Sequence, residues 1–449
     1  MKIHFNPKDF LRQFKIVMSV ALVRDIKPVL CNVKIVADKR DGVVLMATDT
    51  EIGIRCRVHA DVSKNGVALL PPKQFRQILE SVKDGWLTLE STKNGIFVTG
   101  EHGEQWGLDT QSPDEFPDVA DFSETAYHEI PARALSETIR RTMFAVDKEN
   151  PRHALNGVCF EHDDNRLIAV ASDGRRLAVL SADVHCVNGH DYDPAIVPVN
   201  VLKLVTKVLK EKSISGTDGV KMAIHTVVDK ERLTTGTVHF HCGNVTIFSR
   251  LVAGRFPKWR AIIPKTDDRL HASVPCKTLQ TALDRMMTTD TEPGILFTFR
   301  QNNLALESRA TESGQSKAAI PVACDGTAEF ILDISFMREY LRLLDAETTI
   351  DIYMTTDNDP VLFEIGDNDR YVVMPMARDK TANAKPEADT GNEVVGKEST
   401  TEEPMKKVES PRPDDGTDLQ TRFFQLQMEN DQLQAKVEHY KTVRLKYAA

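Results

Sequence analysis

Apolar residues recur at two different periods along this chain. In some stretches they return every three or four positions, the spacing of an amphipathic helix, and in others they alternate with polar residues, as in a half-buried strand. Three helical stretches open with the same Pro-x-x-x-Leu spacing, at Pro7/Leu11, Pro131/Leu135 and Pro275/Leu279. Proline suits the first turn of a helix because the N–H that it lacks would be unpaired there. We therefore predict a helix near each of these prolines.

A second helical stretch follows each of the first three. These partners begin at Pro71, Pro198 and Asp333. Between the helices, alternating runs such as RLIAVASDGRRLAVLSADV and TVHFHCGNVTIFSRLVAG are separated by turn residues. Alternation with one polar face predicts antiparallel sheets packed on helices, which is an α+β fold.

The order strand, helix, strands, helix, strands occurs three times, which predicts three structurally similar domains. Phe-Pro pairs at Phe116-Pro117 and Phe256-Pro257 mark extended segments near the first two domain ends. We expect the domains at 1–125, 126–264 and 265–378. Repeats of this size indicate duplicated whole domains, whose similar faces can be arranged around a common axis as a ring.

Composition places the chain among ordinary soluble proteins. Hydrophobic residues make up 41% of its 449 residues and charged residues 27%. The first residues, MKIHFNPKDFLRQF, are amphipathic and contain no apolar run of signal-peptide or membrane-span length. The seven cysteines are single and odd in number, as expected of buried thiols in a reducing compartment. We expect a cytoplasmic protein without a membrane partner.

The net charge of −9 argues against a nucleic-acid partner, but the distribution of charge argues for one. All six helical stretches carry lysine or arginine and few acids. Solvated helix faces are the ordinary explanation for one such stretch. Recurrence in all three repeats instead favours one positive surface per domain, while the acidic remainder repels DNA from the other faces.

Several short motifs then carry a family resemblance. They are LNGV at Leu155–Val158, SDGRRLAV at Ser172–Val179, GRFPKW with IIP at Gly254–Pro264, and DPVLFE followed by YVVMPM, which ends at Met376. In this order, and across residues 1 to about 377, the chain resembles the bacterial DNA polymerase III beta subunit, the replication sliding clamp. The resemblance implies a head-to-tail homodimer of six similar domains, with helices lining a central hole and sheets outside.

The implied function is to hold the DNA polymerase III catalytic subunit on its template, after a clamp loader has placed the ring on DNA. A closed ring is retained topologically, so it needs only weak, sequence-independent contacts with the phosphates of double-stranded DNA. The helical charges and the resemblance together place the following residues at the DNA: Arg24, Lys73, Arg76, Arg140, Arg141, Lys148, Arg152, Lys203, Lys207 and Lys210. The resemblance also puts Glu149 and His153 in the loop nearest the DNA.

The resemblance further implies an apolar groove between the second and third domains that captures short peptides of partner proteins. Its walls here would be Leu155, Ser172, Gly174, Arg175, Arg176, Leu177, Pro257, Ile262, Val372, Val373, Met374, Pro375 and Met376. Arg175 stands where the family usually has histidine, and Ala261 where a basic residue is frequent, so partner selectivity is expected to differ. The alternative for 372–376 is an ordinary core strand.

Ring closure would join the first domain of one subunit to the third domain of the other. The resemblance assigns this dimer interface to Trp106 and to residues around Met286, Met287 and Thr288. Aromatic residues often anchor interfaces, and the alternative for Trp106 is a core residue of an edge strand.

Enzyme chemistry finds little support in the sequence. It has no Walker-type glycine loop, no GxSxG, no HExxH and no Cys/His pairs at zinc spacing, so we predict neither catalysis nor a metal or other cofactor. In VHFHC, His239 and His241 would face one side of a strand and Cys242 the other. A peptide-binding scaffold that never loads onto DNA, or a specialised copy of the clamp, remains an alternative.

The chain continues well beyond the stretch that resembles the family. Residues 379–416 are rich in Pro, Glu, Thr, Lys and Asp and lack aromatics, which predicts a disordered linker. Leu419, Leu426, Leu433 and Tyr440 then recur every seven residues, which predicts a helix over 417–447. Asn430 would occupy an a position, as in two-stranded coiled coils, and a single amphipathic helix that docks on another surface is the alternative.

Overall fold

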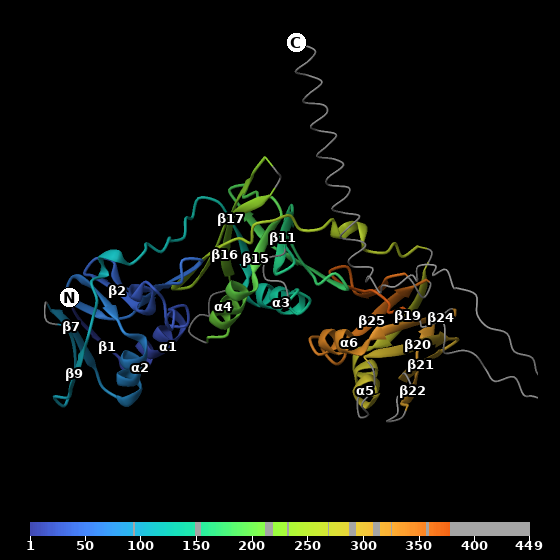
Figure 1. The fold of residues 1–449 in the computed structure, drawn as a ribbon, viewed down its shortest axis with the longest axis horizontal. Coiled ribbons are helices and arrows are strands. Elements are labelled where there is room, and N and C mark those ends of the chain that lie inside the picture. The colour runs from blue at the N-terminus through green and yellow to red at the C-terminus, as the bar shows by residue number, and fades with distance from the viewer. Residues whose placement is uncertain are drawn as a thin grey trace, which may run out of the picture. The chain divides into compact units, whose positions relative to one another are not determined.

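The described part of the chain repeats one order of elements three times: a strand, a helix, five strands, a helix and three strands (Figure 1). The computed structural model describes residues 1–92, 95–148, 154–211, 219–230, 233–267, 269–286, 293–308, 315–324, 326–355 and 359–377. Residues Met1–Arg378 form one compact unit. The predicted linker at 379–416 and helix at 417–447 lie outside the described residues. The expected domain boundaries stay a prediction, and we refer to the observed units as first, second and third repeats.

The first repeat runs from β1 to β9. Its strands are β1 (Lys2–Phe5), β2 (Val33–Asp38), β3 (Gly42–Thr48), β4 (Ile52–Val58), β5 (Asp61–Lys64), β6 (Gly66–Leu70), β7 (Leu87–Thr92), β8 (Gly95–Gly100) and β9 (Gln105–Leu108). Its helices are α1 (Pro7–Val17) and α2 (Pro72–Ser81). The short 3-10 helices η1 (Pro28–Cys31) and η2 (Pro113–Glu115) lie in its connections.

The second and third repeats have the same order. The second contains β10 (Tyr127–Pro131), α3 (Ala132–Met143), β11 (Gly157–Asp163), β12 (Arg166–Ser172), β13 (Arg176–Asp183), β14 (His185–Val187), β15 (Ala195–Pro198), α4 (Val199–Leu209), β16 (Gly219–Val228), β17 (Thr234–Cys242) and β18 (Val245–Arg250), followed by η3 (Trp259–Ala261). The third contains β19 (Leu270–Pro275), α5 (Cys276–Met286), β20 (Gly294–Arg300), β21 (Asn303–Ser308), β22 (Lys317–Pro321), β23 (Ala323–Cys324), β24 (Ala328–Asp333), α6 (Ile334–Leu341), β25 (Thr349–Met354), β26 (Val361–Ile365) and β27 (Asp369–Val373).

Six helices therefore lie where the apolar spacing predicted them, each beginning at or directly after the proline or aspartate named above. The α1 helix begins at Pro7 because the side chain of Asn6 accepts hydrogen bonds from the backbone N–H groups of Lys8 and Asp9. Its buried Phe14 then packs against Phe75 of α2, with ring centroids 5.0 Å apart. In each repeat the two helices are neighbours (Figure 1).

In the described residues, four antiparallel sheets pack with the helices, and two of these sheets cross from one repeat to the next. Strand β18 of the second repeat pairs with β4 of the first, and β27 of the third pairs with β13 of the second. In both junctions the last strand of one repeat thus joins the third strand after the first helix of the preceding repeat. The two strands left over by this rule, β9 and β22, each end a sheet.

Buried charge reinforces the junction between the second and third repeats. The Arg141 guanidinium on α3 donates a 2.6 Å hydrogen bond to Asp369 on β27, and that of Arg176 on β13 donates a 2.7 Å bond to Glu339 on α6. Burial raises the pKa of Asp369 to about 6, an effect that the neighbouring Arg141 opposes. Removing one partner would leave a buried charge unpaired, so these pairs fix the register of the two repeats.

The cysteines differ in their burial. All seven cysteines are free, but Cys31 and Cys186 are only partly buried, which corrects the expectation that every thiol is enclosed. Cys31 ends the 3-10 helix η1, and Cys186 lies on the short strand β14 at the end of its sheet. No helix among the described residues is long and apolar enough to cross a membrane.

Imidazole and phenol rings cluster at one end of the second repeat. The Tyr192 ring centroid lies 5.7 Å from that of His128, 4.8 Å from that of His162 and 5.5 Å from that of His190. His128 is 1% exposed, and neither of its ring nitrogens has a hydrogen-bond partner among the described residues. The His190 Nε2 accepts a 3.0 Å hydrogen bond from the Ile224 backbone N–H, so this imidazole is neutral. Burial lowers the pKa of both His128 and His190 to about 4.

Acid is therefore expected to destabilise the second repeat. Because the folded-state pKa values of His128 and His190 lie below the ordinary value near 6.5, the unfolded chain binds more protons, and stability falls as pH drops from about 6.5 towards 4. From pH 7 to pH 5.5 the two groups together cost about 2 kcal/mol of unfolding free energy. The neighbouring Asp191 raises both pKa values, and His225 lowers the pKa of His190. Thermal unfolding across this range, with His128→Phe as the matched variant, measures the effect. An unchanged pH slope in that variant would remove His128 from the explanation.

Candidate functional site

The helical lysines of the second repeat form an exposed row. In α4, Val201, Leu202, Val205 and Val208 are buried, and Lys203 and Lys207 lie on the opposite, exposed face. Lys210, the C-terminal cap residue, continues this row. None of the three lysines forms an ion pair with a described residue, so their charges are available to an anionic partner. We call Lys203, Lys207 and Lys210 the α4 lysine row.

The other predicted DNA-facing residues divide into exposed and engaged side chains. Arg24, Lys73 and Lys148 are exposed. Arg76 is exposed but donates a 3.0 Å hydrogen bond to Glu80, which also accepts one from Lys15 at 2.8 Å in an ion pair. These hydrogen bonds lower the pKa of the Glu80 carboxyl, so the carboxylate stays charged beside the two cations.

Arg141 is the clearest departure among the predicted DNA contacts. Its side chain is 13% exposed and is held by Asp369, so it occupies the junction between repeats and not a free helix face. Arg140 is half-buried and donates to Glu137 and to the Leu343 carbonyl oxygen. Arg140 lies three residues and Arg141 four residues after Glu137, so both pair with this carboxylate on the same helix. Counting the positive charges of the helix did not take this pairing into account. Arg152, with Glu149 and His153, lies outside the described residues.

The predicted peptide pocket is built on the β13–β27 junction. Leu177 on β13 faces Val372 on β27 in the strand register, and both belong to one apolar cluster with Leu155, Phe256 and Trp259. Ile262 and Met374 are 37% and 41% exposed, and the Met374 N–H donates a 2.9 Å hydrogen bond to the Arg175 carbonyl oxygen. Gly174 and Arg175 are exposed at its edge, whereas Pro257, Pro375 and Met376 are partly buried. The structure thus brings most of the predicted wall residues together.

A rigid turn shapes one side of this pocket. The Ser172 hydroxyl donates a 2.7 Å hydrogen bond to the Arg176 carbonyl oxygen and accepts one from the Gly174 N–H at 3.1 Å. Asp173 accepts hydrogen bonds from the N–H groups of Arg175 and Arg176. Gly174 has φ +86°, a conformation that favours glycine. These contacts fix the turn between β12 and β13 before any ligand binds.

Two predicted wall residues point the other way. Arg176 pairs in register with Val373, and side chains alternate along a strand, so both lie on the face opposite to Leu177 and Val372. Val373 is fully buried in the main core, and the Arg176 guanidinium lies over the Phe336 ring at 4.3 Å. Arg176 and Val373 therefore support the pocket from behind and do not line it, which corrects the prediction for these two.

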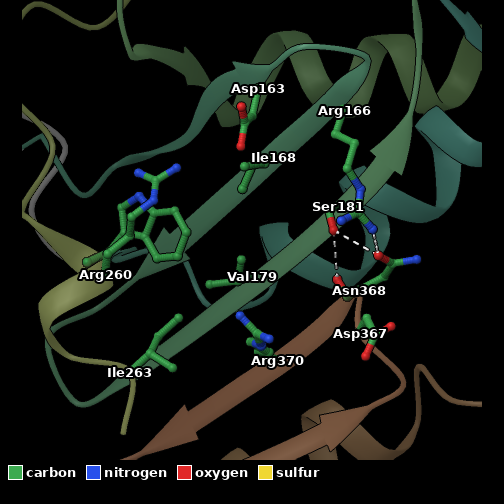
Figure 2. Close-up of a pocket in the computed structure, with 11 residues that line it drawn as sticks. Asp163, Arg166, Ile168, Val179, Ser181, Arg260, Ile263, Asp367, Asn368 and Arg370 are labelled. Atoms are coloured by element: carbon green, nitrogen blue, oxygen red, sulfur yellow. Dashed lines mark hydrogen bonds between the residues drawn. The ribbon is translucent and has the colours of Figure 1, made fainter. Parts of the chain in front are cut away.

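The sequence did not predict another cavity, which lies along the same strands as the predicted peptide pocket. A pocket of about 570 Å³ lies between η3 and the strands β12, β13 and β27. Figure 2 shows Ile168 and Val179 on neighbouring strands of this pocket, with Arg260 and Ile263 beside them. The alternation of β12 and β13 could have indicated Ile168 and Val179, but the contribution of residues 259–263 comes from a segment without strand periodicity.

The predicted dimer-interface residues differ in their exposure to the surface. Trp106 lies half-buried on β9, at the end of its sheet. Met286 is the last residue of α5 and is 1% exposed within the core, so it is not on a surface, which corrects its assignment to the interface. Met287 and Thr288 lie outside the described residues.

The geometry gives no support to a metal centre. Among the described residues, no group of three or more His, Cys, Asp or Glu side chains could hold a metal ion. On β17, His239 and His241 are partly exposed and Cys242 is buried, as their alternation predicted.

Family models and curated proteins match most of this chain. Residues 1–120 match the family model of the DNA polymerase III beta subunit N-terminal domain, and residues 129–258 match that of its central domain, together more than half of the chain. The chain is 25% identical over 384 residues to a beta sliding clamp of Salmonella typhimurium, covering 84% of this chain and 100% of that protein. It is 26% identical over 372 residues to one of Pseudomonas aeruginosa, covering 82% and 97%.

Solved structures agree with this fold. A DNA polymerase III beta subunit of Pseudomonas aeruginosa has a TM-score of 0.74 at 24% identity, over 84% of this chain and 100% of that one. A DNA polymerase sliding clamp of Bacillus subtilis has a TM-score of 0.75 at 22% identity, over 84% and 99%. A further Pseudomonas aeruginosa clamp, at 25% identity and a TM-score of 0.74, was solved with griselimycin bound.

Proposed function

Because the chain belongs to the DNA polymerase III beta subunit family, we propose that it closes into a ring around duplex DNA and holds the polymerase on its template. The protein is a non-catalytic processivity factor. It encircles DNA and offers docking surfaces to other proteins, and it makes or breaks no covalent bond. Its partners are double-stranded DNA, contacted without regard to sequence, and a DNA polymerase. The DNA polymerase III catalytic subunit and a clamp loader are the specific proteins that we propose for the peptide pocket.

The strand pairing between repeats is the observation that carries this proposal. The first repeat is joined to the second through β4 and β18, and the second to the third through β13 and β27. By position in the repeat, β22 corresponds to β4 and β13, and β9 corresponds to β18 and β27. Two copies placed head to tail would pair β9 of each with β22 of the other, so that all six junctions are alike and the ring closes.

Ring closure can be tested at Gly107 on β9. The Gly100 N–H donates to the Glu104 carbonyl oxygen, and antiparallel pairs alternate, so Trp106 bonds inward to β8 while the Gly107 N–H points to the free edge. Gly107→Pro removes that outward N–H and leaves the inward ladder intact. We expect this variant to be a monomer, as measured by sedimentation. Its circular dichroism spectrum should match that of the unchanged chain.

Gly107→Ala is the matched control, since an added Cβ meets only the Phe97 ring at 3.9 Å and the N–H is kept. This variant should remain a dimer. If both variants dimerise with equal affinity, β9 is not at the subunit interface.

A specialised clamp that recruits partners through its C-terminal extension is a second candidate. It is favoured by one observation: the alignments cover nearly all of the relatives but only 84% of this chain. We propose that residues 417–447 form a coiled coil or a docking helix, and that the protein acts in the cytoplasm. A chain that ends at Lys380 should then lose partners in pull-down while keeping the polymerase. An identical partner profile would leave the extension without this function.

A further inference from the structure

A groove that differs from the cavity in Figure 2 lies beside the predicted peptide pocket. It has a volume of about 610 Å³ and separates the β16–β17 hairpin from residues 255–261. Pro257 belongs both to this groove and to the predicted pocket wall, and Ala261, which also lines the groove, precedes Ile262 of the pocket. We call this hollow the hairpin groove. A peptide leaving the pocket over residues 257–262 would enter it directly.

The floor of the hairpin groove is apolar and fixed in place. Phe256 and Trp259 are 8% and 6% exposed, and both pack in the same cluster as Leu177 and Val372. The Trp259 indole N–H donates a 2.9 Å hydrogen bond to Glu161. The same carboxylate accepts a 2.6 Å bond from Arg260, whose guanidinium lies 4.2 Å from the Trp259 ring centroid. These contacts leave the floor preformed.

Exposed apolar side chains occur on the hairpin that bounds the groove. On the hairpin, Val227, Val228 and Leu233 are 66%, 43% and 38% exposed, and Val228 lines the groove. With Ile262 and Met374 at the pocket, they make up most of the exposed large hydrophobic side chains of the described residues. An exposed apolar side chain at the wall of a groove, such as Val228, is available to a partner that covers this surface.

The rim of the groove carries unpaired positive charge. Arg255 and Lys258 are exposed, and neither forms an ion pair with a described residue. Of the two acids that line the groove, Glu161 is neutralised by Arg260, and only Asp193 opposes the two free cations. In a chain of net charge −9, the local balance therefore favours an acidic ligand.

We propose that the hairpin groove binds the segment of a partner peptide that flanks the residues seated in the pocket. This segment would carry an apolar side chain against Phe256, Trp259 and Val228, and an acidic side chain at Arg255 and Lys258. The inference rests on the proposed function, because it extends the pocket of a clamp. A concave apolar floor suits a peptide and would contribute nothing to binding a phosphate backbone.

The test uses overlapping synthetic peptides that tile the DNA polymerase III catalytic subunit of the same organism. The tightest-binding peptide is measured against the full chain, against R255E/K258E, and against K39E/R40E as the control. Lys39 and Arg40 are exposed in the turn between β2 and β3 of the first repeat, so the control carries the same change in net charge. A third variant, Val228→Ser, removes the exposed apolar wall without touching the core.

We expect R255E/K258E to weaken binding about three- to tenfold at low salt, and the loss to shrink at high salt because the contacts are exposed. K39E/R40E should bind as the unchanged chain does, and Val228→Ser should weaken binding about two- to threefold. Replacing the acidic residues of the peptide flank by alanine should abolish the difference between R255E/K258E and the unchanged chain. Equal affinity of R255E/K258E and K39E/R40E would overturn the proposal.

Two further comparisons separate the possible failures. Loss of affinity in Met374→Ala, whose exposed side chain does not line the groove, shows that the pocket itself works, whatever the groove does. A different outcome is that R255E/K258E changes peptide affinity only in the full chain and not in a chain ending at Lys380. In that case the acidic extension of this chain occupies the groove, and the proposed partner peptide does not.

Discussion

Reversal of the α4 lysine row, as Lys203→Glu, Lys207→Glu and Lys210→Glu together, is expected to weaken loading and to shorten residence on DNA. The three side chains are exposed on one helix face and have no ion-pair partner among the described residues, so the full change of six charges reaches the DNA. Because these residues lie on α4 and not on the β9 or β22 edges, the mass of the proposed dimer should not change.

The neutral variants make this prediction quantitative. If each lysine contacts one phosphate, changing all three to glutamine reduces the slope of log K against log salt concentration by about 3. The control reverses Lys39, Arg40 and Lys64, which are equally exposed on β-sheet turns and strands of the first repeat. A salt slope that is the same in the glutamine variant and the unchanged chain would show that the α4 lysine row does not face DNA.

Loss of partner peptides in Leu177→Asp is the second large effect expected. Leu177 is 2% exposed and packs among Leu155, Val372 and Trp259, so the carboxylate would be buried in an apolar cluster or would force the pocket open. Binding of a polymerase peptide should fall by about 2 kcal/mol or more, the scale of a central anchor. Titration of the labelled peptide measures this loss.

Two milder variants guard against simple misfolding of Leu177→Asp. Ile262→Ala and Met374→Ala remove exposed side chains, so the fold should be kept while peptide affinity falls. Val67→Ala, at a similarly exposed position on β6 of the first repeat, should leave affinity unchanged. Affinity that is as high in Ile262→Ala and Met374→Ala as in Val67→Ala would place the pocket elsewhere.

The helices and the overall class could be predicted from the sequence because their signals are local. Proline or aspartate at each start and a 3.6-residue apolar period were enough to place α1 to α6 within a residue or two. The triplication followed from the same signals, since each repeat shows them in the same order.

The candidate site was predicted less evenly, for reasons that are also physical. A continuous run of sequence was assigned to the pocket at 174–177 and 372–376, but alternation along β13 and β27 turns Arg176 and Val373 to the opposite face. Met286 closes the core at the end of α5, and Arg141 is drawn into the junction by Asp369, which lies 228 residues away. Pairing over such separations leaves no local pattern.

The hairpin groove illustrates the same limit. Its lining joins Glu161, Val228 and Phe256, which come from two strands and a connecting segment. Each is unremarkable in its own stretch of sequence, and only the folded chain shows that they line one groove with Arg255 and Lys258, which form no ion pair with a described residue.

The central claim, that the protein is a closed ring retained on DNA by topology, is tested most directly by its retention on circular and linear DNA. Equal amounts are loaded by the clamp loader onto nicked circular DNA, one half is linearised by a restriction enzyme, and retained protein is followed over time in moderate salt. We expect the protein to stay on the circle and to leave the linear molecule through its ends. Equal retention on both would contradict the ring, because contacts with phosphates alone do not distinguish a circle from a line of the same sequence.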